Sequence, residues 1–164
     1  MLSAEVRVIA SRRTVKVSHS ESKEKTMSKT PARLIVEAFG NCEALANMYT
    51  DDVVWRLNYS LPANIAGPHI GKAAVTAFND AVFNKIYDGG NMQINIHDEI
   101  GNEQSSVVRF DIHATSRRGN SYDVEYVLFA KTKDGKVCEV TELLDTLAST
   151  EQHQGNPVGL PPTD

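Results

Sequence analysis

The second half of the chain alternates between apolar and polar residues with a period of two, and this pattern restricts the fold more than any other feature of the sequence. Alternation with this period is typical of β-strands that have one buried and one exposed face. Turn-forming segments interrupt it at Gly101-Asn102, at Arg118-Gly119-Asn120 and at Asp134-Gly135. Because such segments form hairpin turns, the pattern predicts an antiparallel meander of four long strands over residues 91–100, 104–115, 122–132 and 136–147.

The first half of the chain has helical spacing instead. Thr30 and Pro31 are a typical N-cap and first helical residue, and apolar residues then recur at helical intervals until Gly40. Asn41 can cap a second short helix, and residues 53–57 form a short strand. A third helix carries one apolar stripe, made of Val75, Phe78, Val82 and Ile86. Together these features predict an α+β fold in which three N-terminal helices cover one face of the antiparallel sheet.

The chain of 164 residues is long enough for one domain, which we place at residues 29–147. Residues 1–28 are expected to be a disordered leader, or the product of a start assigned too early with Met27 as the true first residue. Their basic, Ser-rich composition leaves a transit peptide as the alternative. Residues 148–164 hold three of the six prolines and are expected to form a flexible C-terminal tail.

The composition argues against several classes of protein. The two cysteines are far apart, which excludes a disulfide scaffold and a Cys-rich zinc module, and no histidine spacing suggests a metal site. Residues 31–164 hold ten basic and eighteen acidic residues, so a nucleic-acid surface is not expected. No run approaches the ~20 apolar residues of a membrane span, and no glycine-rich nucleotide motif is present. We therefore expect a cytoplasmic protein with no cofactor, no metal and no membrane partner.

The segment VVRFDIHA at residues 107–114 presents two different faces. Val108, Phe110 and Ile112 point to one side, whereas Arg109, Asp111 and His113 point to the other. We expect the apolar side to form a subunit contact. The polar side would then lie in a cavity beneath the helices.

Glu142 is a carboxylate between apolar neighbours on the last predicted strand. If its face also lines the cavity, Glu142 and Asp111 would flank Arg109. Burial favours the protonated form of one such carboxyl, which allows one acid to donate a proton while the other accepts one. A buried ion pair with a purely structural role is the alternative interpretation.

The run from Val107 to Asp145 resembles the sheet of SnoaL-like members of the nuclear transport factor 2-like superfamily, which also includes ketosteroid isomerases and polyketide cyclases. The resemblance rests on the segments R-F-D, G-N-S-Y-D, D-G-K-V and T-E-L-L-D, and on Y-T-D-D-V-V-W and G-K-A-A-V earlier in the chain. It covers about residues 30–147. It implies a cone-shaped, curved sheet with the helices on its concave face, an apolar pocket and a homodimer.

Within this superfamily, the chain is similar to limonene epoxide hydrolase in its possible mechanism. That family uses an R-x-D pair, matched here by Arg109 and Asp111, and an acid on the last strand, where this chain has Glu142. The resemblance implies that Asp111 protonates the epoxide oxygen, that Glu142 activates water and that Arg109 bridges them. The family's water-holding Tyr and Asn correspond to Trp55 and Leu57, and Asn58 or Tyr59 could replace those contacts.

Other chemistries of the superfamily leave different expectations open. Polyketide cyclases use an acid/base carboxylate in the pocket, which Asp111 or Glu142 could supply, and His113 could join a proton relay. The catalytic Asp of ketosteroid isomerases corresponds to Leu57, so that base is absent. The residues expected to bind the substrate are Trp55, Asn58, Tyr59, Phe78, Val82, His113, Val124 and Tyr126.

The sequence thus predicts a cofactor-independent SnoaL-like enzyme that acts on a small hydrophobic oxygenated molecule by hydrolysis, cyclisation or isomerisation. Arg109, Asp111 and Glu142 are the predicted catalytic residues. The alternative is a binding or dimerisation module of the same fold with no catalytic activity.

Overall fold

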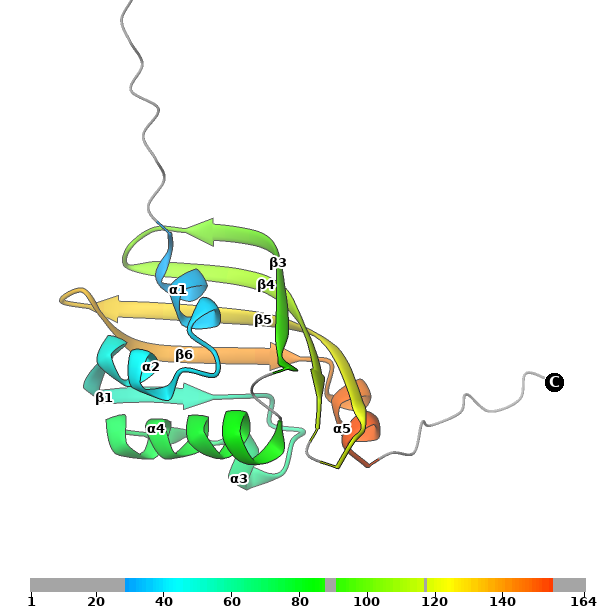
Figure 1. The fold of residues 1–164 in the computed structure, drawn as a ribbon. Coiled ribbons are helices and arrows are strands. Elements are labelled where there is room, and N and C mark those ends of the chain that lie inside the picture. The colour runs from blue at the N-terminus through cyan, green and yellow to red at the C-terminus, as the bar shows by residue number, and fades with distance from the viewer. Residues whose placement is uncertain (1–28, 88–90, 117, 155–164) are drawn as a thin grey trace, which may run out of the picture.

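The computed structural model describes residues 29–87, 91–116 and 118–154, and the predicted leader at residues 1–28 lies outside them. It contains one six-stranded sheet and a layer of helices (Figure 1). The helices are α1 (Pro31–Glu37), α2 (Cys42–Met48), α3 (Ala63–Ala66), α4 (Lys72–Asp80), the π-helix η1 (Ala81–Ile86) and α5 (Thr146–Gln154). The strands are β1 (Tyr49–Arg56), β2 (His69–Ile70), β3 (Gln93–Gly101), β4 (Ser105–Thr115), β5 (Ser121–Lys133) and β6 (Lys136–Leu144). No helix within these described ranges is long and apolar enough to cross a membrane.

The four long strands pair as the alternating pattern predicts. The sheet order is β2-β1-β6-β5-β4-β3, and strands β3 to β6 are antiparallel to their neighbours in that series. The turn between β5 and β6 has positive φ angles at Asp134 (52°) and Gly135 (76°). This is the backbone of a type I′ turn, whose twist matches that of the flanking strands. The predicted α+β fold is therefore confirmed.

The parallel pairing of β1 with β6 was not predicted. In this register Trp55 lies opposite Val140. Paired residues in adjacent strands share a face, and so do residues two apart in one strand. The register therefore places the Trp55 indole on the same face as Glu142.

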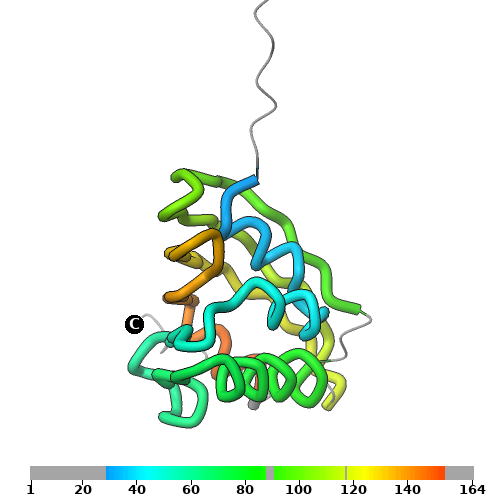
Figure 2. The backbone as a smooth tube through the Cα atoms, turned by 90° about the vertical axis from the view of Figure 1, so that its left-hand side faces the viewer, coloured from blue at the N-terminus to red at the C-terminus, as the bar shows by residue number. Residues whose placement is uncertain are grey.

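The helices cover one face of a strongly bent sheet. Helix α1 packs on β4 and β5, α4 packs on β1, and α2 packs against α4. Figures 1 and 2 show how the long strands curl around this helical layer. Val108, Phe110 and Ile112 point toward it and are at most 2% exposed. This corrects the expectation of a subunit contact, because the chain's own helices already cover that face. The homodimer stays a prediction.

The first part of the predicted tail, residues 148–154, is helical rather than irregular, and residues 155–164 lie outside the described residues. Helix α5 extends to Gln154 and packs on β5. It begins next to Asp145, whose carboxylate accepts a hydrogen bond from the Ala148 amide at 3.0 Å and so acts as a cap. The short elements α3 and β2, which lie between the predicted strand at residues 53–57 and the third predicted helix, were also not predicted.

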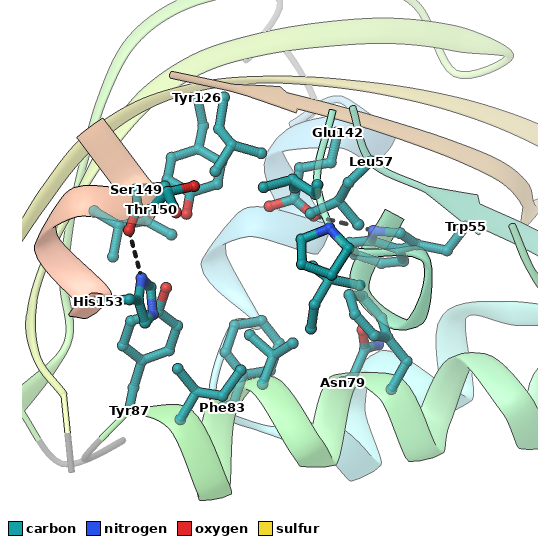
Figure 3. Close-up of a pocket in the computed structure, with 18 residues that line it drawn as sticks. Trp55, Leu57, Asn79, Phe83, Tyr87, Tyr126, Glu142, Ser149, Thr150 and His153 are labelled. Carbon is teal, nitrogen blue, oxygen red and sulfur yellow. Dashed lines mark hydrogen bonds between the residues drawn. The ribbon is translucent and has the colours of Figure 1, made fainter. Parts of the chain in front are cut away.

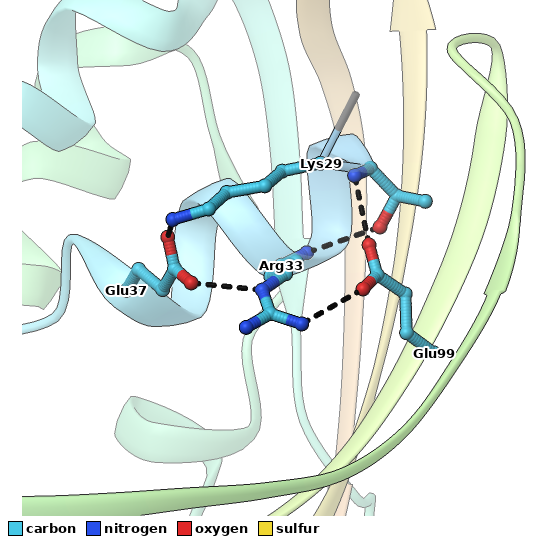
Figure 4. A network of polar contacts seen from close by, with 5 residues as sticks. Lys29, Arg33, Glu37 and Glu99 are labelled. Atoms are coloured by element: carbon cyan, nitrogen blue, oxygen red, sulfur yellow. Dashed lines mark hydrogen bonds and ion pairs between the residues drawn. The ribbon is translucent and has the colours of Figure 1, made fainter. Parts of the chain in front are cut away.

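Polar contacts fix the first turn of α1 to β3 and β4. The Thr30 amide donates to Glu99 Oε1 at 2.8 Å, and Arg33 Nη1 donates to Glu99 Oε2 at 3.1 Å (Figure 4). The Ala32 amide donates to the buried Ser106 Oγ at 2.9 Å. Because the first amides of a helix have no partner within it, these bonds determine where α1 begins on the sheet.

Replacing Ser106 with Ala is expected to lower the free energy of unfolding by about 1–3 kcal/mol, because the buried Ala32 amide would lose its acceptor. Urea unfolding followed by circular dichroism measures this change. Ser105→Ala, at the exposed neighbouring position, is the matched control and is expected to change stability by less than about 0.5 kcal/mol. Equal stabilities of the two variants would contradict the anchoring role of Ser106.

Candidate active site

A cavity of about 260 Å³ lies between the sheet and the helices, and residues of α5 form part of its lining. This is slightly below the range of about 300–1,000 Å³ common for small-molecule sites. Its walls are mostly apolar, and Figure 3 shows the labelled polar residues in two groups on opposite sides of it. The lining residues that carry the chemistry are Trp55, Asn79, Tyr87, Tyr126, Glu142 and His153.

Glu142 forms the first polar group, together with Trp55. Its strand partner Leu128 pairs in turn with Val108, so all three side chains point to the helical side of the sheet. Glu142 as a whole residue is 6% exposed. Trp55 Nε1 donates to its Oε2 at 3.0 Å, the only hydrogen bond that the described residues give it.

The environment of Glu142 shifts its acidity into the neutral range. Burial disfavours the charged form and raises the pKa of Glu142 from 4.5 to about 7, although the Trp55 hydrogen bond works in the opposite direction. A group with this pKa is present in both protonation states at neutral pH. It can therefore take a proton from a ligand or donate one to it.

The second polar group is a cluster of hydroxyls at the other side of the cavity. Tyr122 and Tyr126 share a hydrogen bond between their hydroxyls, and the Tyr122 hydroxyl donates to Ser149 Oγ at 3.1 Å. The Tyr87 ring lies 5.0 Å from that of Tyr122. Burial raises the pKa values of all three tyrosines, so they stay protonated and remain hydrogen-bond donors. Such a cluster can stabilise negative charge that develops on a ligand oxygen.

His153 reaches the same side of the cavity from α5. Its Nδ1 lies 2.7 Å from the Ser149 carbonyl oxygen. Because a carbonyl can only accept, Nδ1 must carry the proton and donate it. In the neutral ring Nε2 is then an acceptor. The ring is held edge-on by Tyr87 and Tyr122, with centroids at 5.6 and 4.9 Å.

The structure does not bring the three predicted catalytic residues together. Arg109 Nε donates to Asp98 at 2.7 Å and its Nη1 donates to Glu125 at 2.6 Å, in a half-exposed network on the outer face. Asp111 contacts His97 at 2.5 Å on the same outer face. The predicted cavity face was the wrong one, because the apolar side of β4 is needed for the core. Glu142 alone of the three lines the cavity.

The predicted binding residues divide in a similar way. Trp55, Phe78, Val82 and Tyr126 line the cavity with Glu142, and their role in binding a substrate stays a prediction. Val124 is buried but is not part of the lining.

The remaining predicted binding residues lie outside the cavity. His113 pairs with Asp123 at 3.0 Å on the outer face. Tyr59 is 77% exposed, with the Arg56 guanidinium 5.5 Å above its ring. Asn58 accepts a hydrogen bond from the Leu144 amide at 2.9 Å, which is a structural role in joining the loop to β6.

The lining residues that the sequence analysis missed include Asn79, Tyr87, Ser149 and His153. One signal was available, since Asn79 interrupts the apolar stripe of the third helix directly after Phe78. The sequence holds no comparable signal for the other three residues, because Ser149 and His153 lie in the predicted tail and Tyr87 lies at the end of a predicted helix. Within the described part of the chain, no three His, Cys, Asp or Glu side chains gather as a metal-binding group.

Solved structures with this architecture include a candidate isomerase from Rhodopseudomonas palustris, with a TM-score of 0.63, 19% identity and coverage of 76% of this chain and 93% of that one. A candidate SnoaL-like polyketide cyclase from Jannaschia sp. CCS1 has a TM-score of 0.62 and 15% identity, and covers 80% and 99%. TerC, crystallised with polyporic acid, has a TM-score of 0.63 and 22% identity, and covers 74% and 94%. Identities this low establish similarity of fold.

The family of the chain follows from comparison of its sequence, not from these similarities of fold. No curated protein shows a significant match to the chain. However, residues 35–140 match the sequence model of the SnoaL-like domain, and this match spans more than half of the chain. The protein belongs to the SnoaL-like domain family and has its nuclear transport factor 2-like fold.

Proposed function

We propose that the protein is a cofactor-independent enzyme that uses Glu142 as its acid/base residue on a small, hydrophobic, oxygenated molecule. The observation that carries this proposal is a buried carboxyl in an apolar cavity, with one Trp55 hydrogen bond and a pKa near neutrality. The cavity volume suits a molecule of one or two rings. The names of the structural neighbours, a candidate isomerase and a candidate polyketide cyclase, support the same class of chemistry.

Isomerisation and cyclisation share a first step that fits this cavity. The Glu142 carboxylate removes a proton from a carbon next to a carbonyl group, and the electron pair moves to the carbonyl oxygen to form an enolate. Because Tyr122 donates its only hydroxyl proton to Ser149, Tyr126 donates its own to Tyr122. The hydroxyls of Tyr87 and Ser149 are then the donors available to that oxygen. Glu142 then returns its proton to another carbon, or the enolate attacks a second carbonyl of the same molecule and the resulting alkoxide takes the proton.

Epoxide hydrolysis is not part of this proposal. It requires Asp111 and Arg109 beside Glu142, whereas both lie on the outer face with other partners.

The shared step can be tested without knowing the natural substrate. With 2-tetralone in D₂O, the protein is expected to catalyse exchange of the protons next to the carbonyl, measured by NMR. The rate is expected to rise with pH and to level off above about 7, because the ionised carboxyl is the base. Glu142→Gln is expected to lower the rate by about 10²–10⁴-fold.

Glu139→Gln is the matched control for this test. Glu139 lies on the same strand but pairs with Lys131 in solvent, so its removal is expected to leave exchange unchanged. Exchange by Glu142→Gln at the parent rate would overturn the proposal. Binding of 2-tetralone with no exchange by the parent protein would favour the non-catalytic binding module instead.

A further inference from the structure

Asn79 is the most deeply buried polar residue in the cavity lining. It lies near the end of α4, next to Phe78, and its side chain is 1% exposed. In Figure 3 it lies on the same side of the cavity as Trp55 and Glu142, and away from the hydroxyl cluster. An amide in such a place needs partners for both its donor and its acceptor.

Only one half of this amide is satisfied within the described residues. Asn79 Nδ2 donates to the Tyr49 hydroxyl at 2.7 Å, which fixes the plane of the amide. Asn79 Oδ1 is buried and has no hydrogen-bond partner among the described residues. An unpaired buried acceptor lowers the stability of the fold by about 1–3 kcal/mol. A ligand that donates a hydrogen bond to this oxygen would remove that cost and bind more tightly.

The neighbouring side chains cannot supply that donor. The Trp55 indole has a single N–H, and Glu142 already accepts it. Phe78 and Phe83 have no polar hydrogen. None of these side chains donates to Oδ1, and Asn79 is among the residues that line the cavity, so a molecule bound there is the available source of a donor.

We infer that Asn79 determines specificity by accepting a hydrogen bond from a hydroxyl group of the substrate. This inference rests on the proposed function for the identity of the reacting end. The substrate class is then a one- or two-ring carbonyl compound with a phenolic, enolic or alcoholic hydroxyl at its Glu142 end. The amide of Asn79 selects such molecules over those with a methyl group in the same place.

The test compares the affinities of 2-naphthol and 2-methylnaphthalene, two probes with the same rings and nearly the same size, by isothermal titration calorimetry. Each variant gives one ratio of affinities, and a change in this ratio is independent of the probes' solvation and of the fraction of folded protein. Asn79→Leu is expected to shift the ratio against 2-naphthol by about tenfold or more. Phe78→Leu, a change in the same helix and the same cavity wall without a polar atom, is expected to leave the ratio unchanged. Asn79→Ala serves in place of Asn79→Leu if the latter does not fold.

An unchanged ratio in Asn79→Leu would overturn the inference, as would failure of the parent protein to bind 2-naphthol. A shift in Glu142→Gln but not in Asn79→Leu would also overturn it, because the hydroxyl would then be held by Glu142, while the proposed function would survive. A shift confined to Asn79→Leu, together with no exchange of 2-tetralone, would support the inference and count against the proposed function. The two failures are therefore distinguishable.

Discussion

Glu142→Gln is expected to raise the free energy of unfolding at pH 8 by about 3 kcal/mol and to leave it nearly unchanged at pH 4. The pKa of Glu142 is about 7 in the folded chain and 4.5 as an ordinary carboxyl. Between these values the folded state binds the proton more tightly than the unfolded state does, so stability falls as the pH rises. Each pKa unit corresponds to about 1.4 kcal/mol, and Gln, which cannot ionise, avoids this loss while its Oε1 still accepts from Trp55.

Urea unfolding of both proteins at pH 4, 6 and 8 measures this difference. Glu139→Gln is the control, since its exposed pair with Lys131 is worth less than about 1 kcal/mol and should not grow with pH in the same way. If the difference between parent and Glu142→Gln stays constant from pH 4 to 8, Glu142 does not titrate near neutrality. A confirmed gain would mean that this carboxyl lowers stability at the pH where it is ionised, which is common for residues kept for function.

The fold could be predicted from the sequence because its signals are local. Strand alternation, the Asp134-Gly135 turn and the Thr30 and Asn41 caps each depend on a few neighbouring residues, and each is present in the structure. The parallel pairing of β1 with β6 is different, since it joins residues more than 80 positions apart. Nothing local in either strand indicates that partner.

The site could be predicted only in part, because alternation separates two faces without saying which one is inside. On β4 the apolar face was expected to form a subunit contact, and the polar face was expected to line the cavity. In the structure the apolar face points inward instead. Val108, Phe110 and Ile112 are buried against the helices, and burial of their apolar surface favours this orientation of the strand. Arg109 and Asp111 instead form ion pairs with Asp98 and His97 on the outer face. Glu142 lines the cavity together with apolar neighbours on the same face of its strand, and its catalytic role stays a prediction.

Part of the cavity lining comes from α5, a helix that the sequence analysis did not predict. Residues 155–164 hold all three C-terminal prolines, and including them with α5 made the whole segment resemble a tail. The Asp145 cap before Ala148 is a local signal for a helix start that could have separated the two. Because α5 was not predicted, nothing in the sequence pattern placed Ser149 and His153 in the site.

Trp55→Phe is expected to move the pH dependence of catalysis to higher pH. Trp55 Nε1 donates to the Glu142 carboxylate and so favours its charged form. A hydrogen bond to a charged group contributes about 1.5–3 kcal/mol, and its loss should raise the pKa of Glu142 by about 1–2 units above its value near 7. Exchange of 2-tetralone at pH 7 should then fall by about 5- to 50-fold, whereas the rate at high pH should be kept, because the ionised base is still present.

This shift separates a role in tuning Glu142 from a role in packing. Trp55 is 1% exposed and packs edge-on against Tyr49, so the variant will also be less stable. Phe78→Leu disturbs the same wall, since the Trp55 and Phe78 rings are 6.4 Å apart, but it leaves the hydrogen bond to Glu142 intact. It should lower stability without moving the midpoint of the pH profile. If both variants move that midpoint equally, or neither does, the Trp55 hydrogen bond does not set the acidity of Glu142. A shift in Trp55→Phe alone would tie the unpredicted parallel pairing of β1 and β6 to the chemistry, because that pairing brings the indole to the carboxyl.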